Sequence, residues 1–173
     1  MVNMRPFTAF EQKNLKFLVN HNVKFTQVEI TPTGLDKGIL DSTAPMRAYF
    51  LEEGVHDYSE QLQGQEFKQM RNAIILTADS QCITQASFYR PNTKKGDPRM
   101  WIYKLGSYTE GNDIHVLFYF ADNLYSINIT RIDIEKCYNS VIVTPLKEVL
   151  TEINQVGNSV SEELLGKFRS VSG

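Results

Sequence analysis

Hydrophobic and polar positions alternate through the middle of the chain, whereas apolar residues recur three and four positions apart near its two ends. Alternation and β-branched runs predict strands, and Asp79-Ser80 and the turn at 121–123 should each join a hairpin of antiparallel strands. The hairpin flanking 121–123 is nearly continuous in apolar residues, so we expect it in the centre of a sheet, covered on both faces. Strands are expected over residues 23–30, 72–78, 81–89, 100–105, 114–120 and 124–129.

The helical spacing predicts amphipathic helices on either side of these strands. Gly157 is expected to end one helix, and Ser159–Glu162 has the spacing of a capping box that would open the last one. Helices are expected at residues 6–20, around 35–39, at 45–54, at 144–157 and from 159 onward. The pattern therefore predicts an α+β fold, with a mostly antiparallel sheet and helices at the N- and C-terminal ends. One domain should span 1–173, with about 144–173 as a helical C-terminal appendage.

Composition changes this picture little but excludes several classes of protein. The 173 residues carry a net charge of −2, so nucleic-acid binding would need a local basic patch. The two cysteines are too few for a disulfide framework, and no histidine is spaced with them as a metal ligand. There is no phosphate-binding glycine motif, signal peptide or membrane-spanning run. We expect a cytoplasmic protein with no cofactor and no membrane contact.

The stretch from Gln85 to Lys104, QASFYRPNTKKGDPRMWIYK, concentrates positive charge and aromatic rings. It carries five cations against one acidic residue, Asp97, between two predicted strands. Cations neutralise phosphates and aromatic faces stack on bases, so this pattern is typical of nucleic-acid binding. The alternative is a solvated hairpin loop whose aromatic side chains pack in the core. The predicted nucleic-acid-binding residues are Tyr89, Arg90, Lys94, Lys95, Arg99, Trp101 and Lys104.

An acidic pattern supports a catalytic alternative. Asp57 precedes Glu66 and Lys68, and carboxylates followed by a Glu-x-Lys pair can hold Mg²⁺ and orient an attacking water. These residues would make the chain a Mg²⁺-dependent endonuclease. However, Glu66 comes before the predicted strand rather than within it, and a polar surface loop explains the same residues equally well.

Three phrases of the sequence carry a resemblance. They are ITPTGLDKGILDSTAPMR (30–47), GVHDYSEQLQGQEFK (54–68) and SFYRPNTKKGDPRMWIYKL (87–105). Together, in order from about Phe25 to Ile129, they resemble the N-terminal, non-catalytic segment of MvaI/BcnI-type restriction endonuclease family proteins. This resemblance implies a DNA-associated module of restriction or defence systems. The nuclease portion expected after such a segment does not follow here, which leaves recognition, regulation or mimicry.

The sequence therefore supports three hypotheses. The first is a non-catalytic DNA-binding recognition or regulatory module. The second is the Mg²⁺-dependent endonuclease built on Asp57, Glu66 and Lys68. The third is a protein-interaction module with a partner in a restriction or defence complex, such as a phage inhibitor of a host defence component.

Overall fold

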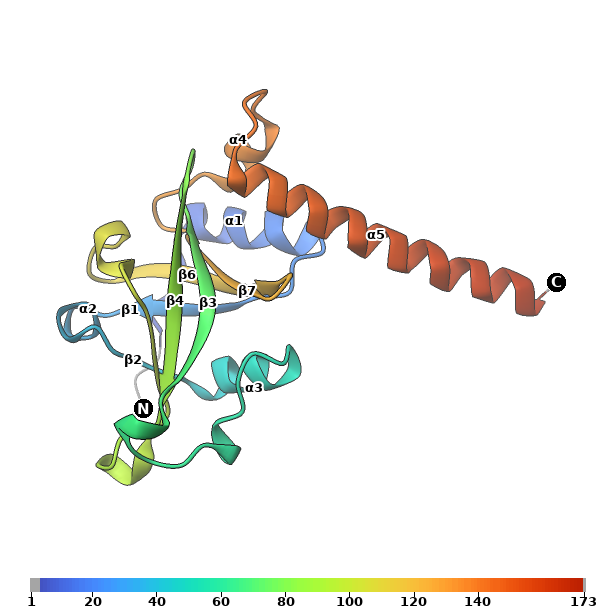
Figure 1. The fold of residues 1–173 in the computed structure, drawn as a ribbon. Helices are drawn as coiled ribbons and strands as arrows, with labels where there is room; N and C mark the ends of the chain where they lie inside the picture. The colour runs from blue at the N-terminus through green and yellow to red at the C-terminus, as the bar shows by residue number, and fades with distance from the viewer. Residues whose placement is uncertain (1–3, 173) are drawn as a thin grey trace.

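The computed structural model of the chain describes residues 4–172, with all their side chains except those of Lys94 and of residues 160–172. Within that part, seven strands form one sheet in the order β1-β6-β7-β3-β4-β5-β2. Neighbours are antiparallel except β3 and β7, which are parallel. The sheet twists until β3 and β4 stand across β6 and β7, giving a nearly barrel-shaped form (Figure 1). The strands are β1 (Thr26–Ile30), β2 (Leu40–Asp41), β3 (Gln69–Leu76), β4 (Gln81–Tyr89), β5 (Arg99–Ile102), β6 (Asp113–Phe120) and β7 (Asn123–Asn128).

Helices cover both faces of this sheet. Among the described residues they are α1 (Ala9–Asn20), α2 (Pro32–Lys37), α3 (Ala44–Glu52), α4 (Ile134–Asn139) and α5 (Pro145–Ser172), with 3₁₀ turns η1 (Tyr58–Glu60), η2 (Gln65–Phe67), η3 (Lys94–Gly96) and η4 (Leu105–Tyr108). The predicted α+β class with a mostly antiparallel sheet is confirmed. The prediction that helices occupy the two ends is only partly right, because α2 and α3 lie between β1 and β3.

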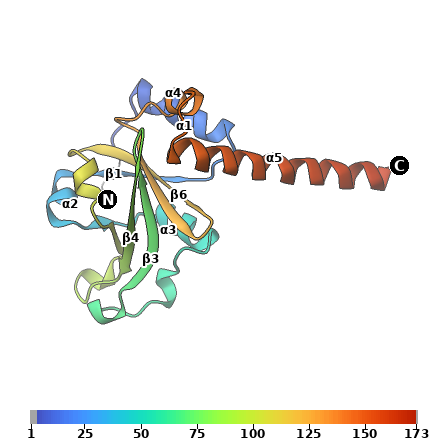
Figure 2. The same ribbon diagram turned by 45° about the horizontal axis from the view of Figure 1, so that its top comes forward.

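Two apolar clusters hold the layers together. One fills the side of the sheet that faces α3, around Phe50, Phe88 and Met100. The other lies between β6, β7 and the helices α1, α4 and α5, which Figure 2 shows on the same side, around Leu18 and Leu150. Strands β6 and β7 contribute side chains to both clusters, so their predicted central position is confirmed. Burial of apolar surface on both faces is the main stabilising term of this arrangement.

The predicted break at Gly157 is wrong, because α5 continues through this residue to Ser172. The capping box at Ser159–Glu162 therefore opens no separate helix. The reason for the glycine is steric: a Cβ atom at position 157 would lie 2.6 Å from Cβ of Asn22. Asn22 lies just beyond the C-terminal end of α1 and donates to Asn154 Oδ1 at 2.8 Å. Glycine usually signals the end of a helix, but Gly157 instead allows α5 to lie close to Asn22.

We predict that Gly157→Ala destabilises the protein by about 1 kcal/mol, although alanine is the better helix former by about 1 kcal/mol. The contact with Asn22 leaves no room for the added methyl group. Urea unfolding would measure the change, and the exposed neighbour Ser159 supplies the control, since Ser159→Ala should be neutral or slightly stabilising. A stabilised Gly157→Ala variant would show that the close contact is unimportant.

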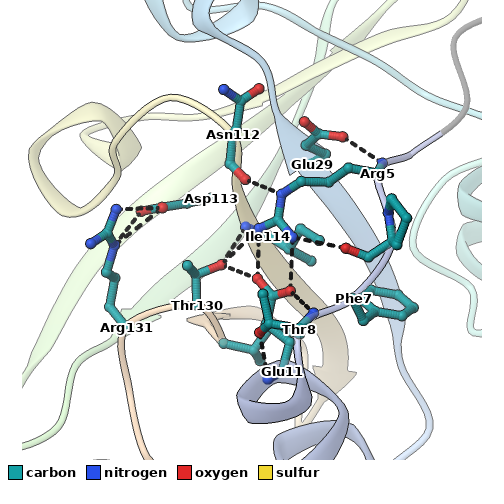
Figure 3. Close-up of polar contacts among 12 residues, drawn as sticks. Arg5, Phe7, Thr8, Glu11, Glu29, Asn112, Asp113, Ile114, Thr130 and Arg131 are labelled. Atoms are coloured by element: carbon teal, nitrogen blue, oxygen red, sulfur yellow. Dashed lines mark hydrogen bonds and ion pairs between the residues drawn. The ribbon is translucent and has the colours of Figure 1, made fainter.

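An extended N-terminal arm, residues 4–8, is held beside β1, where Arg5 N donates to Glu29 Oε1 at 2.9 Å (Figure 3). The Arg5 guanidinium donates to both carboxylate oxygens of Glu11, at 2.9 and 2.6 Å, and its Nε donates to Asn112 O at 2.9 Å. Glu11 is fully buried and also accepts bonds from Thr8 N and Thr130 Oγ1. The bonds from Arg5 are the main reason that the pKa of Glu11 falls to about 2. Helix α1 begins at Ala9 rather than at the predicted position 6, because Thr8 is its N-cap: Thr8 Oγ1 accepts from Glu11 N, and the Glu11 carboxylate accepts from Thr8 N.

Candidate nucleic-acid interface

Two loops that are distant in the sequence interlock at one end of the sheet. Residues 61–68 precede β3, and residues 90–98 join β4 to β5. Gly64 N donates to Arg90 O at 2.7 Å. The Arg90 side chain then crosses between the loops, donating from Nε to Gly96 O and from Nη1 to Gln61 O, each at 3.0 Å. Arg90 therefore positions the loops, and two of the phrases that carry the sequence resemblance contact each other here.

Gly96 is required by this interlock. Its φ is +70°, in the left-handed region that favours glycine. A Cβ atom at this position would lie 2.0 Å from Nε2 of Gln63. The preceding Lys95 also has a positive φ, of 59°, and its side chain is exposed. The loop thus folds tightly against residues 61–63 and presents Lys95 outward.

The loop of residues 90–98 forms one wall of a groove of about 410 Å³. Helix α3 forms the opposite wall, and residues 56–59 lie between them; all three segments are at the same end of the molecule in Figure 1. Tyr58 fastens these parts together, since its hydroxyl bonds to Ser42 Oγ at 2.6 Å and donates to Arg99 O at 2.9 Å. The groove is lined by Arg47, Ala48, Leu51, His56, Asp57, Tyr58, Ser59, Arg90, Lys95, Gly96, Asp97 and Pro98.

Three cations line this groove: Arg47 comes from α3, and Arg90 and Lys95 come from the loop of residues 90–98. Within the described part of the chain, none of them forms an ion pair with a carboxylate. Arg47 Nη1 and Arg90 donate only to neutral carbonyl oxygens in the bonds they make. Against them stand Asp57, whose Oδ1 accepts bonds from Ser59 N and Oγ, and the exposed Asp97. The groove therefore carries an excess of one positive charge, with its cations free to attract an anion.

His56 lies at the base of the groove as a neutral side chain. Gln61 Nε2 donates to the carbonyl oxygens of Phe67 and Phe88, so Gln61 Oε1 must accept the 2.8 Å bond from His56 Nε2. The proton is then on Nε2, and buried Nδ1 has no hydrogen-bond partner among the described residues. Burial is the main cause that lowers the pKa of His56. The ring stacks on Phe88, with centroids 4.9 Å apart, and so supports the groove from inside.

Three of the predicted binding residues lie instead on the outer face of the sheet. Tyr89 and Arg99 are directly opposite each other on β4 and β5, and Trp101 is two residues further along β5. Arg99 forms an ion pair with Asp41 and is mostly buried. Tyr89 is buried, with the ammonium group of Lys68 5.4 Å from its ring centroid. Cationic and aromatic side chains are therefore adjacent on this face, but most of their contacts are with other residues of the protein.

Of the two remaining predicted cations, Lys104 is not among the residues that line the groove. Lys104 lies beyond the far end of β5, where it caps η4 with φ +70° and an exposed side chain. Lys94 begins η3, and its side chain lies outside the described residues. The predicted set thus divides: Arg90 and Lys95 line the groove, and Tyr89, Arg99 and Trp101 follow the outer face.

The residues of the endonuclease alternative lie on separate turns. Asp57 caps η1 through Ser59, Glu66 is exposed on η2, and half-buried Lys68 follows η2 and faces Tyr89. Among the described residues, no group of three or more His, Cys, Asp or Glu side chains is arranged to hold a metal ion. The structure supplies no support for a Mg²⁺ site built on these residues.

A second polar cluster lies inside the sheet, beside a cavity of about 170 Å³. His115 is fully buried; its Nδ1 bonds to Ser126 Oγ at 2.7 Å and its Nε2 to Thr109 Oγ1 at 2.9 Å. Burial lowers the pKa of His115 to about 4, so the ring is neutral. Ser126 is also fully buried, and both ring nitrogens of His115 are engaged by hydroxyl groups of the protein.

No protein-family model matches the chain, and searches of curated proteins and of solved structures returned no match either. The resemblance to the N-terminal segment of MvaI/BcnI-type endonucleases therefore stays a prediction from the sequence phrases. None of the helices over residues 4–172 has the length and apolar character needed to cross a membrane.

Sequence reasoning missed Arg47, the cation that completes the groove. It lies on α3 between the buried residues Met46 and Tyr49, so its exposure follows from helical periodicity. What the pattern could not reveal is that α3 faces the loop carrying Lys95, because more than 40 residues separate them in the sequence.

Proposed function

We propose that this chain is a non-catalytic nucleic-acid-binding module that holds its ligand at the groove between α3 and the loop of residues 90–98. The observation that carries the proposal is the convergence of Arg47, Arg90 and Lys95, none of which pairs with a carboxylate in the described part of the chain. Phosphate contacts supply most of the affinity of non-specific nucleic-acid binding, and the salt-dependent part comes from Lys and Arg side chains that neutralise phosphates. The role in restriction or defence, and the location in the cytoplasm, are parts of this proposal that rest on the sequence.

The test is a titration of labelled single-stranded and duplex DNA by fluorescence anisotropy across a range of salt concentrations. Replacing both Arg47 and Lys95 with alanine should weaken binding roughly 10- to 100-fold near 0.1 M salt. The slope of log Kd against log salt should fall by about one for each phosphate that is no longer neutralised. Arg90 is left unchanged in this variant because it also holds the loops together.

The matched control replaces two other exposed lysines, Lys24 and Lys136, with alanine. It removes the same charge from the molecule but leaves the groove intact. We expect the control to bind like the wild type, apart from a small change in long-range attraction. Equal weakening in the two double variants, or no binding by the wild-type protein, would end the proposal.

One observation favours the protein-interaction alternative. The connection between α4 and α5 exposes Val141, Ile142 and Val143 at 94%, 67% and 66% of their surfaces. Both ends of this connection are anchored, since Lys147 donates to Ser140 O and Thr144 caps α5. Consecutive exposed apolar side chains are unusual in a soluble domain and mark contact surfaces. If the chain binds no nucleic acid in the titration above, this surface becomes the preferred candidate.

A further inference from the structure

The lining of the groove combines charge with apolar surface in a way that phosphate binding alone does not require. Arg47 and Leu51 are four residues apart on α3 and therefore project from the same side of the helix. Leu51 is 58% exposed, which is high for a leucine beside two unpaired cations. Ala48 adds apolar surface beside Leu51 on α3, and Pro98 adds apolar surface from the 90–98 loop. A ligand that matches this lining has an anionic group next to a flat apolar group.

Two carboxylates also line the groove, Asp57 and the exposed Asp97. A groove that tracked only phosphates would be weakened by them, because like charges repel. Carboxylates accept hydrogen bonds from base amino and ring N–H groups, such as the N4 amino group of cytosine. The groove therefore has cations that attract a phosphate and carboxylates that accept hydrogen bonds from a base. Such a combination fits a ligand with both a phosphate and an accessible base edge.

The size of the groove selects between strand types. Its volume of about 410 Å³ is within the range of about 300–1,000 Å³ for small-molecule sites, so it suits a single nucleotide unit. In a duplex, the base faces are stacked and the pairing edges are occupied. Single strands can turn out an unstacked base and offer both its face and its edge. The phosphates of a duplex could contact Arg47 and Lys95, but its bases could not contact Leu51 or the two carboxylates.

We propose that the groove holds one unpaired nucleotide of a single-stranded nucleic acid, with its phosphate near Arg47 and Lys95 and its base against Leu51. The inference rests on the proposed function and specifies its ligand. Single-stranded DNA and RNA share this chemistry, and the structure favours neither.

The test compares wild-type protein with Leu51→Gln and Leu62→Gln. Leu62 is 62% exposed and does not line the groove, so it is a matched control for removal of an exposed leucine. Binding is titrated with a 12-nucleotide DNA strand, the same strand as RNA, its duplex, and a strand of equal length made of abasic sites. All arms are run at one ionic strength, and the wild type and Leu51→Gln are also run across salt.

We expect the wild type to bind single strands at least tenfold more tightly than the duplex or the abasic strand. Leu51→Gln should weaken binding of the base-bearing strand about fivefold or more, as expected when a base is no longer supported by an apolar surface. It should leave the salt slope unchanged, because the cations that neutralise phosphates are all retained. Leu62→Gln should match the wild type, and tight binding of either the DNA or the RNA strand supports the inference.

Equal affinity for duplex, abasic and base-bearing strands, together with matching Leu51→Gln and Leu62→Gln variants, would overturn this inference. The proposed function would survive that result if the Arg47/Lys95 double variant still bound more weakly. If the wild type bound none of the four ligands, the proposed function would fail and this inference with it.

Discussion

Replacing Glu11 with glutamine is expected to destabilise the fold by about 3 kcal/mol at neutral pH. Glu11 is fully buried and accepts four bonds, from Arg5 Nη1 and Nη2, Thr8 N and Thr130 Oγ1. The amide keeps the size of the side chain but removes the charge that Arg5 requires. Since the Arg5 side chain is 28% exposed, solvent screens part of the loss, and we take the lower end of the range for breaking a buried pair.

The pH dependence follows from the direction of the shift. The pKa of Glu11 falls from 4.5 to about 2 on folding, chiefly through the bonds from Arg5. A carboxylate with a depressed folded-state pKa contributes its full stabilisation above about pH 4.5 and loses it as the pH falls toward 2. The Glu11→Gln variant lacks this contribution at every pH, so its stability should decline less than that of the wild type between pH 5 and 2.5.

Urea unfolding at pH 7, 5, 4 and 3 would measure both effects. Glu152→Gln, an exposed carboxylate on α5, removes the same charge at the surface and should change the stability by less than about 0.5 kcal/mol. Asp113 also has a lowered pKa; burial opposes the shift, but bonds from Arg131, Glu110 N and Asn128 outweigh it. Some acid sensitivity should therefore remain in Glu11→Gln. Parallel pH profiles for the wild type and the variant would show that the Arg5–Glu11 pair does not stabilise the arm.

The second large effect is expected at Arg90, where methionine should destabilise the protein by about 2–3 kcal/mol. The Arg90 guanidinium is half-buried and bridges the carbonyl oxygens of Gln61 and Gly96, and hydrogen bonds made by charged groups contribute about 1.5–3 kcal/mol. Methionine retains the apolar stem but leaves both carbonyls without this donor. Lysine should be intermediate, because a single ammonium group does not reproduce the two-pronged geometry of a guanidinium.

Hydrogen exchange at the Gly64 amide reports this interaction locally, because Gly64 N donates to Arg90 O across the two loops. Exchange there should accelerate in Arg90→Met, while amides within β6 keep their protection until global unfolding. Lys95→Ala removes the same charge five residues away at an exposed site, so its stability should stay within about 0.5 kcal/mol of the wild type. Equal stability of Arg90→Met and Lys95→Ala would refute the positioning role of Arg90.

The same residue shows how far the candidate site could be predicted. Local composition drew attention to the loop around Arg90 and Lys95, because cations gathered between two strands are visible in the sequence alone. Composition alone does not distinguish one loop cation from another. In the structure, Arg99 is paired with Asp41 and Arg90 bonds to backbone carbonyls. Which cation is free to bind a ligand depends on acceptors that are remote in the sequence.

The sequence by itself determined the α+β class and the two hairpins. Strand β4 matches the predicted range 81–89, and both predicted hairpins are present, because alternation and turn residues act over a few neighbouring positions. Only the tertiary structure decided the parallel pairing of β3 with β7, the continuity of α5 through Gly157, and the approach of α3 to the loop of residues 90–98. These features depend on contacts between distant segments, where burial and steric fit override local preference, and the groove exists only where such segments meet.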